Sequence, residues 1–164
     1  MISELIKNAV IFGCKGPYLT DDEYNFFKET SPFGFILFSR NIVNAQQVNA
    51  LCLSLREAVG WYAPVLIDQE GGRVQRIKHP LAEDWLPPLD EARKAGRKAK
   101  SIFEFRFSKI AKELRLLGID FNCAPVLDIA RPFTHKFLRN RCYGENKSDV
   151  ISLGKVAYNA LKSN

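Results

Sequence analysis

The chain has 164 residues, of which 46% are hydrophobic and 26% are charged, and its net charge is +6. This composition is ordinary for a single globular domain. No apolar run approaches the ~18 residues that a membrane-spanning helix needs, and the first residues do not resemble a secretory signal. We therefore expect a cytoplasmic protein that has no membrane partner.

The cysteines and histidines argue against a metal or disulfide framework. The sequence has four cysteines, none in a Cys-x-x-Cys pair, and its two histidines, His79 and His135, lie far apart. Reduced and mostly buried thiols are therefore expected, together with no metal site and no cofactor.

Four strand–helix units follow one another along the chain. The apolar runs that predict strands lie at residues 9–13, 34–38, 64–68 and 119–127. Thr20 and Asn44 are typical N-caps for the first two helices. A long third helix is expected from about Asp90 to Leu117, ended by Gly118. The last helix is expected to begin at a Ser148 cap. Repeated units of this kind predict an α/β fold with a parallel sheet and right-handed crossovers.

The most informative segment, IDQEGGRVQR, occupies residues 67–76 and directly follows the third predicted strand. In α/β proteins, ligands bind at the C-terminal ends of the strands. The Asp68 carboxylate and the Arg76 guanidinium could face a common pocket there. The first accepts and the second donates hydrogen bonds, which suits the hydroxyls of a sugar. From the spacing alone, a structural turn with a local ion pair fits equally well.

The same segment closely resembles the signature of glycoside hydrolase family 3, in its bacterial β-N-acetylglucosaminidase (β-N-acetylhexosaminidase) branch. Three further segments resemble that family in the same order: GFILFSRNI at 34–42, GIDFNCAPVLD at 118–128 and RCYGEN at 141–146. The resemblance implies a TIM-barrel (β/α)8 family fold, truncated here to about four βα units. Residues 1–164 would then be the N-terminal part of a catalytic barrel domain, and the open sheet edges of such a half-barrel invite self-association.

The resemblance also implies which residues contact a substrate. By motif position, Asp68, Arg76 and Arg141 match substrate-binding residues of the family. The family's nucleophile and its general acid/base lie downstream of residue 164, so no catalytic residue is assigned, and Glu70 and Asp128 stay unassigned. Each binding residue has a structural alternative: Asp68 could cap the turn, Arg76 could pair with Glu70, and Arg141 could hold its own loop.

Three functions remain open at this point. The first is a β-N-acetylhexosaminidase that removes terminal N-acetylglucosamine from peptidoglycan fragments during cell-wall recycling, with a muropeptide or related sugar as its partner. The second is an inactive truncated remnant, or a non-catalytic sugar-binding or assembly module. A nucleic-acid binder is the third, because residues 91–117 hold nine Lys or Arg against three Glu. We favour a solvated helix face for that stretch and expect no nucleic-acid partner.

Overall fold

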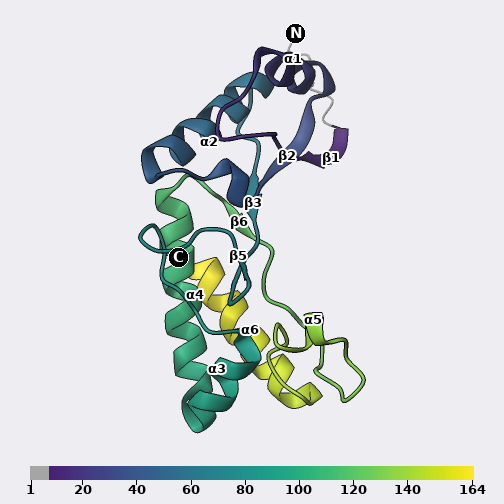
Figure 1. Ribbon diagram of the computed structural model, residues 1–164, viewed down its shortest axis with the longest axis vertical. Helices are drawn as coiled ribbons and strands as arrows, with labels where there is room; N and C mark the ends of the chain where they lie inside the picture. Colours follow the sequence, from purple (N-terminus) through teal and green to yellow (C-terminus); the bar gives the residue numbers. More distant parts are fainter. Residues whose placement is uncertain (1–7) are drawn as a thin grey trace. The chain divides into compact units, whose positions relative to one another are not determined.

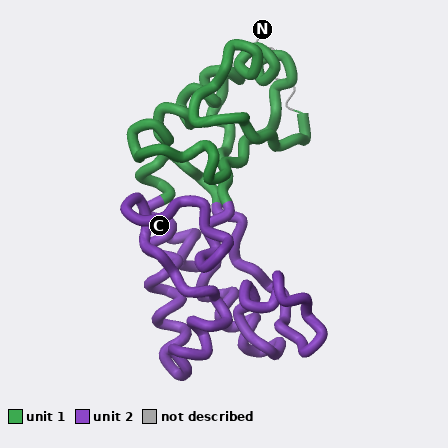
Figure 2. The backbone as a smooth tube through the Cα atoms, viewed as in Figure 1, with its two compact units in different colours: residues 1–67, 114–121 green, residues 68–113, 122–164 purple. Residues whose placement is uncertain are grey.

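The computed structural model describes residues 8–164, which fall into two compact units (Figure 2). Unit 1 comprises the residues up to Ile67 together with Leu114–Phe121. Unit 2 comprises Asp68–Glu113 together with Asn122–Asn164. None of the helices in the described part of the chain is long and apolar enough to cross a membrane.

The main sheet follows the chain order that the sequence predicts (Figure 1). Its strands are β1 (Asn8–Phe12), β2 (Pro32–Leu37), β3 (Val65–Ile67) and β6 (Phe121–Asn122), in the order β1-β2-β3-β6. β1 pairs with β2 in parallel and β2 pairs with β3 in parallel, with Phe35 opposite Val65. The predicted α/β fold with a parallel sheet is therefore confirmed.

Two helices of unit 1 begin at the predicted caps, and a short 3-10 helix lies between them. They are α1 (Asp21–Thr30), the short 3-10 helix η1 (Ser39–Asn41) and α2 (Ala45–Val59). Thr20 and Glu23 form a capping box at the start of α1, and the Asn44 side chain accepts the backbone N–H of Gln47 at 2.9 Å. The buried core of this unit includes Phe27, Phe35, Leu37, Leu51, Leu55 and Ile67.

Asp120 ties the two sequence segments of unit 1 together. Its carboxylate pairs with Arg56 at 2.7 Å and accepts the Tyr62 hydroxyl at 3.0 Å and the Val65 backbone N–H at 2.8 Å. The hydrogen bond to the Asp120 carboxylate raises the pKa of Tyr62. The Asp120 carboxylate, from Leu114–Phe121, thus binds three groups from the segment that ends at Ile67.

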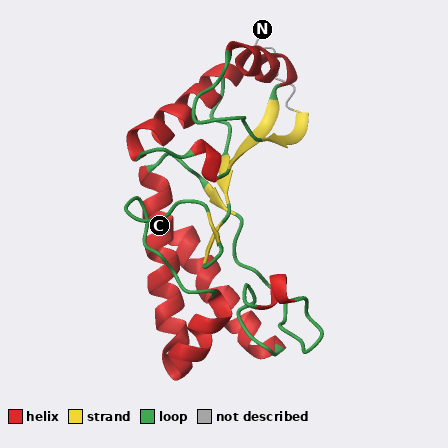
Figure 3. Ribbon diagram, viewed as in Figure 1, coloured by secondary structure: helices red, strands yellow, loops and turns green. Residues whose placement is uncertain are grey.

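Unit 2 combines helices with one hairpin and long connecting loops (Figure 3). Its elements are β4 (Gln69–Gly71), β5 (Val74–Gln75), α3 (Pro88–Ala95), η2 (Gly96–Lys98), α4 (Ala99–Leu116, whose last turn belongs to unit 1), α5 (Lys136–Arg139) and α6 (Lys147–Ser163). The single helix expected from Asp90 to Leu117 is wrong. Gly96 has φ of 52° and ψ of −121°, so the helical path is interrupted there and resumes through η2.

Two further boundaries differ from the sequence-based expectation. The fourth strand has only two residues, because β3 beside it ends at Ile67 and because Pro125 has no N–H to donate to a ladder. The last helix begins at Lys147, since Asn146 rather than Ser148 is its cap: the Asn146 side chain accepts the Asp149 backbone N–H at 3.0 Å.

Candidate functional site

The segment 67–76 forms a tight antiparallel hairpin, β4–β5, whose turn requires glycine at two positions. Gly71 has φ of +96° and Gly72 has φ of +63°. A Cβ on Gly71 would lie 1.9 Å from Nη2 of Arg106, and one on Gly72 would lie 2.9 Å from Cα of Pro87. The glycines therefore serve both the backbone conformation and the close packing of the hairpin.

Arg106 of α4 holds this hairpin from inside unit 2. Its side chain is fully buried, donates hydrogen bonds to the backbone carbonyls of Glu70 and Leu86, and forms an ion pair with Glu91. The sequence predicted a solvated face for the basic stretch at 91–117, and the burial of Arg106 departs from that expectation. The available signal was its position on the apolar side of the helix, between Phe103 and Ile110.

Amide side chains fix the two ends of the hairpin. Asn122 donates to the Gln69 carbonyl at 2.8 Å and accepts the Gln69 N–H at 2.9 Å. The buried Gln69 side chain in turn accepts the backbone N–H groups of Arg76 at 3.0 Å and Ile77 at 3.1 Å. The backbone positions of Gln69 and Arg76 are thereby coupled through side-chain hydrogen bonds.

Two carboxylate–arginine pairs form on this scaffold. The Arg76 Nη2 donates to the Asp68 Oδ2 at 2.6 Å, and both side chains are about one quarter exposed, at 27% and 24%. Arg141 binds Glu70 through a fork, with Nε–Oε2 at 2.9 Å and Nη2–Oε1 at 2.6 Å. Glu70 is only 2% exposed, whereas Arg141 is 25% exposed, so the arginine is the accessible member of that pair.

Both pairs belong to one electrostatic neighbourhood. The hydrogen bond to Glu70 raises the pKa of Arg141, and the charges of Glu70, Asp68 and Asp128 raise it further. Burial raises the pKa of the Cys123 thiol to about 11, with the next largest contributions from the charge of Asp68 and a hydrogen bond to it. The four residues Asp68, Glu70, Arg76 and Arg141, called the carboxylate–arginine cluster below, therefore act on the same small region.

The structure thus brings together the three residues that the sequence singled out. Arg76 forms its ion pair with Asp68, whereas Glu70 pairs with Arg141. The alternative in which Arg76 pairs with Glu70 is therefore wrong. The partnership of Glu70 with Arg141 joins residues 71 positions apart, and the sequence analysis did not anticipate it. Chemically, the cluster offers charged acceptors and donors on side chains that solvent reaches, which is what binding of a polyhydroxylated ligand requires.

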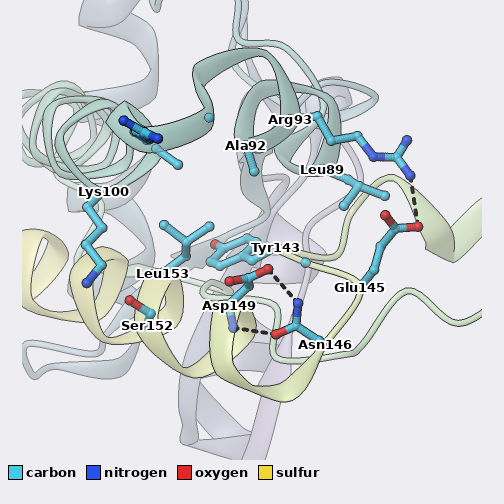
Figure 4. A pocket seen from close by; sticks show the side chains of 14 residues that line it. Leu89, Ala92, Arg93, Lys100, Tyr143, Glu145, Asn146, Asp149, Ser152 and Leu153 are labelled. Carbon is cyan, nitrogen blue, oxygen red and sulfur yellow. Dashed lines mark hydrogen bonds and ion pairs between the residues drawn. The ribbon is translucent and has the colours of Figure 1, made fainter.

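A separate hollow of about 390 Å³ in unit 2 is lined by residues of α3, α4 and α6 (Figure 4). Two contacts join polar groups of its lining: Arg93 pairs with Glu145 at 2.9 Å, and the Asn146 amide donates to the Asp149 carboxylate at 2.7 Å. These contacts stabilise the start of α6, and none of them involves the carboxylate–arginine cluster.

Comparison with known proteins gives consistent matches over most of the chain. The family model described as "Glycosyl hydrolase family 3 N terminal domain" matches residues 10–164. A protein called Beta-hexosaminidase from Stenotrophomonas maltophilia (strain R551-3) is 31% identical over 153 residues, which is 91% of this chain and 44% of that protein. The chain thus spans less than half the length of the curated relatives it matches.

Solved structures agree with the sequence comparison. The crystal structure of native NagZ from Neisseria gonorrhoeae matches with a TM-score of 0.85 at 25% identity, over 95% of this chain and 46% of that chain. A second structure of the same protein, in complex with N-trifluoroacetyl-D-glucosamine, matches with the same TM-score of 0.85 over 95% of this chain and 47% of that chain.

Proposed function

This chain belongs to glycoside hydrolase family 3, and on that premise we propose that it binds a terminal N-acetylhexosamine residue of a glycan at the carboxylate–arginine cluster. The observation that carries the proposal is the meeting of Asp68, Arg76 and Arg141 around one small region of unit 2. The relatives' name, Beta-hexosaminidase, and the glucosamine derivative held by the similar NagZ structure supply the class of sugar.

The three binding residues have distinct roles in this proposal. Asp68 accepts hydrogen bonds from sugar hydroxyls, and Arg76 holds its carboxylate and donates to neighbouring oxygens. Arg141 presents its exposed side toward the sugar while Glu70 fixes the guanidinium plane from behind. Glu70 is nearly inaccessible, so its role is to position Arg141 and not to contact the ligand.

As for activity, we propose that residues 1–164 are the N-terminal part of a catalytic barrel domain. The whole enzyme would be cytoplasmic and would act on peptidoglycan fragments in cell-wall recycling. Retaining hydrolysis requires a nucleophile and an acid/base on opposite sides of the bond. We expect both groups to lie downstream of residue 164, as the family resemblance implies. The 164-residue polypeptide assayed by itself is therefore proposed to be inactive, as a sugar-binding or assembly module.

The alternative of nucleic-acid binding receives no support from the basic stretch at 91–117. Of its basic residues, Arg106 is fully buried, while Arg93 and Lys109 are engaged in ion pairs with Glu145 and Glu83. Three of the nine basic residues thus serve contacts within unit 2. Self-association through the open sheet edge stays a prediction, which sedimentation of the isolated chain over a range of concentrations can check.

The test of sugar binding is a calorimetric or NMR titration of the chain with methyl N-acetyl-β-glucosaminide. Asp68→Asn keeps the shape of the side chain but removes its charge, and we expect binding to weaken by roughly tenfold or more, because hydrogen bonds to charged groups contribute about 1.5–3 kcal/mol. Lys109→Ala is the matched control, since it breaks an exposed ion pair of the same unit outside the cluster. Equal affinity of Asp68→Asn and the original chain would refute the proposed site.

A further inference from the structure

One loop of unit 2 carries three large apolar side chains that stay exposed to solvent. It spans residues 131–139, includes the short helix α5 and is seen at that label in Figure 1. Phe133 is 84% exposed, Phe137 is 54% exposed and Leu138 is 41% exposed. Large apolar side chains gathered on one exposed segment mark an interaction surface on a globular protein. This segment is called the aromatic loop below.

The backbone of the aromatic loop is held by hydrogen bonds within the loop. The Arg131 N–H donates to the Thr134 hydroxyl at 2.9 Å, and the Thr134 N–H donates to the Arg131 carbonyl at 3.0 Å. The His135 ring accepts the backbone N–H of Phe137 at 3.1 Å. The aromatic side chains therefore stand on a segment that is already shaped, which lowers the entropy that a ligand must take from it.

Phe137 stacks against an arginine of the site hairpin. The Cζ atom of Arg73, in the turn between β4 and β5, lies 4.0 Å from the centroid of the Phe137 ring. A guanidinium at this distance is attracted to the π face of the ring and holds it in place. Because the Phe137 side chain is nevertheless 54% exposed, much of its ring stays open to a ligand.

The stack adjoins the carboxylate–arginine cluster. Arg73 lies three residues from both Glu70 and Arg76, and Phe137 lies four residues from Arg141. The hairpin and the loop are thus joined twice, by the ring stack and by the fork between Glu70 and Arg141. An open aromatic ring therefore stands beside the charged groups of the proposed sugar site.

These neighbours suit the two kinds of surface that a sugar presents. A pyranose ring carries hydroxyls at its rim and C–H groups on its faces. Charged donors and acceptors bind the hydroxyls, whereas the negative π face of an aromatic ring attracts the C–H groups and removes them from water. Binding sites for small molecules combine the two in this way, with aromatic walls and a few polar groups that fix orientation.

We propose that the aromatic loop is a second sugar subsite. In it, Phe137, backed by Arg73, stacks on the residue next to the one that the carboxylate–arginine cluster binds. The ligand class is therefore an oligosaccharide and not an isolated N-acetylhexosamine. This inference rests on the proposed sugar binding at the cluster and extends it by one residue of the glycan.

The size of the apolar surface favours a sugar over a protein partner. At about 200 Å² for each fully exposed side chain, the exposed parts of Phe133, Phe137 and Leu138 amount to roughly 350 Å². A standard protein interface buries about 800 Å² on each partner, whereas a sugar ring needs only one aromatic face. A second copy of this chain would also bring the exposed Arg73 and Lys136 near their own counterparts.

Calorimetric titration of the chain with two sugars tests the subsite. N,N′-diacetylchitobiose should bind about three- to tenfold more tightly than methyl N-acetyl-β-glucosaminide, which is the gain expected from one aromatic contact. Phe137→Ala should abolish this gain and leave the affinity for the monosaccharide within about twofold. Tyr158→Ala is the matched control, because Tyr158 is 53% exposed on α6 of the same unit, with Lys162 near its ring. It should keep both affinities.

A second variant and a second measurement separate stacking from a structural effect. Phe137→Trp keeps an aromatic face and should keep the gain, and the disaccharide but not the monosaccharide should shift the NMR signals of the Phe137 ring. If the monosaccharide binds but the disaccharide binds no more tightly, or if Phe137→Ala weakens both sugars equally, the subsite is refuted while the proposed sugar site stands. If neither sugar binds, both proposals fail. Dimers of the chain that Phe137→Ala dissociates would also overturn the subsite, since a second copy would then occupy the loop.

Discussion

The guanidinium of Arg106 occupies the space that any side chain on Gly71 would need. An ideal Cβ at Gly71 would lie 1.9 Å from the Arg106 Nη2, and the same arginine donates to the carbonyl of Glu70 one residue earlier. The conformation of the site hairpin therefore depends on a residue of α4 that contacts no proposed ligand.

Gly71→Ala should destabilise the protein more than a change at another glycine with positive φ. Gly60 has φ of +72° but no atom within 4 Å of its added Cβ, so Gly60→Ala reports backbone strain alone, about 1–2 kcal/mol. Gly71→Ala adds a clash with Arg106 and should cost about 1–3 kcal/mol more. Chemical denaturation of both variants measures the difference, and equal losses would show that the hairpin simply moves away.

Arg106→Met should destabilise the protein by about 3 kcal/mol or more, because it leaves the Glu91 carboxylate without its buried partner. Adding Glu91→Gln in the same chain should restore part of that loss, since the unpaired charge is then removed. Urea denaturation of the single and double variants checks this expectation. If the double variant loses as much as the sum of the two single variants, the two residues are not coupled.

Arg141→Lys should weaken sugar binding even though the charge is kept, because lysine cannot reproduce the forked contact with Glu70. Glu70→Gln should weaken binding less, since a neutral acceptor still orients the guanidinium. Titration with methyl N-acetyl-β-glucosaminide ranks the two variants. The reverse order would mean that Glu70 contacts the sugar directly.

Alkylation of Cys123 offers a pH-dependent probe of the same region. Cys123 is the exposed one of four free cysteines, and burial together with Asp68 raises the pKa of its thiol to about 11. The thiol therefore stays protonated at pH 8, and its reaction with iodoacetamide should be slow there and accelerate as the pH rises toward 11. Asp68→Asn removes the charge that disfavours the thiolate, so it should lower the pKa and speed the reaction at pH 8. An unchanged rate would place the Asp68 charge away from the thiol.

A further prediction concerns the rate at which the isolated chain hydrolyses an N-acetylglucosaminide. On the proposal that the nucleophile and the acid/base lie outside residues 1–164, purified chain mixed with a chromogenic N-acetylglucosaminide should show a rate near background. General acid–base catalysis alone typically contributes ~10²–10⁴-fold, and the covalent route would be lost as well. A full-length family enzyme assayed beside it sets the scale. Turnover within about tenfold of that enzyme would mean that another residue, such as Glu70 or Asp128, performs the chemistry.

Local signals predicted the strand–helix order and several helix starts. Thr20 and Asn44 cap their helices as expected, because an N-cap depends only on a side chain and the backbone three residues later. Gly96 was missed because helix-forming residues surround it, and a single glycine is tolerated in many helices. Asn146 and Ser148 are both good caps by composition, and only the structure decides between them.

The sequence named three residues of the candidate site, whose role in binding stays a prediction, but it did not show how their side chains pair. The motif pointed to Asp68, Arg76 and Arg141, yet the fork between Glu70 and Arg141 depends on the tertiary packing of β4 against a loop 71 residues away. The burial of Arg106 likewise depends on which side of α4 faces the hairpin. Such contacts are set by the assembled fold, which no local pattern contains.

The contacts of the Asp120 carboxylate with Arg56, Tyr62 and Val65 can form only after Asp120 has been synthesised. Synthesis at about 5–20 residues per second leaves a delay of ~3–10 s between the emergence of residue 67 and that of Asp120. During that interval the nascent N-terminal segment has no acid for Arg56, and residues destined for unit 2 are already leaving the ribosome. The sheet of unit 1 therefore matures only after Asp120 has emerged, and a polypeptide that stops at Ile67 should be a poor substitute for unit 1.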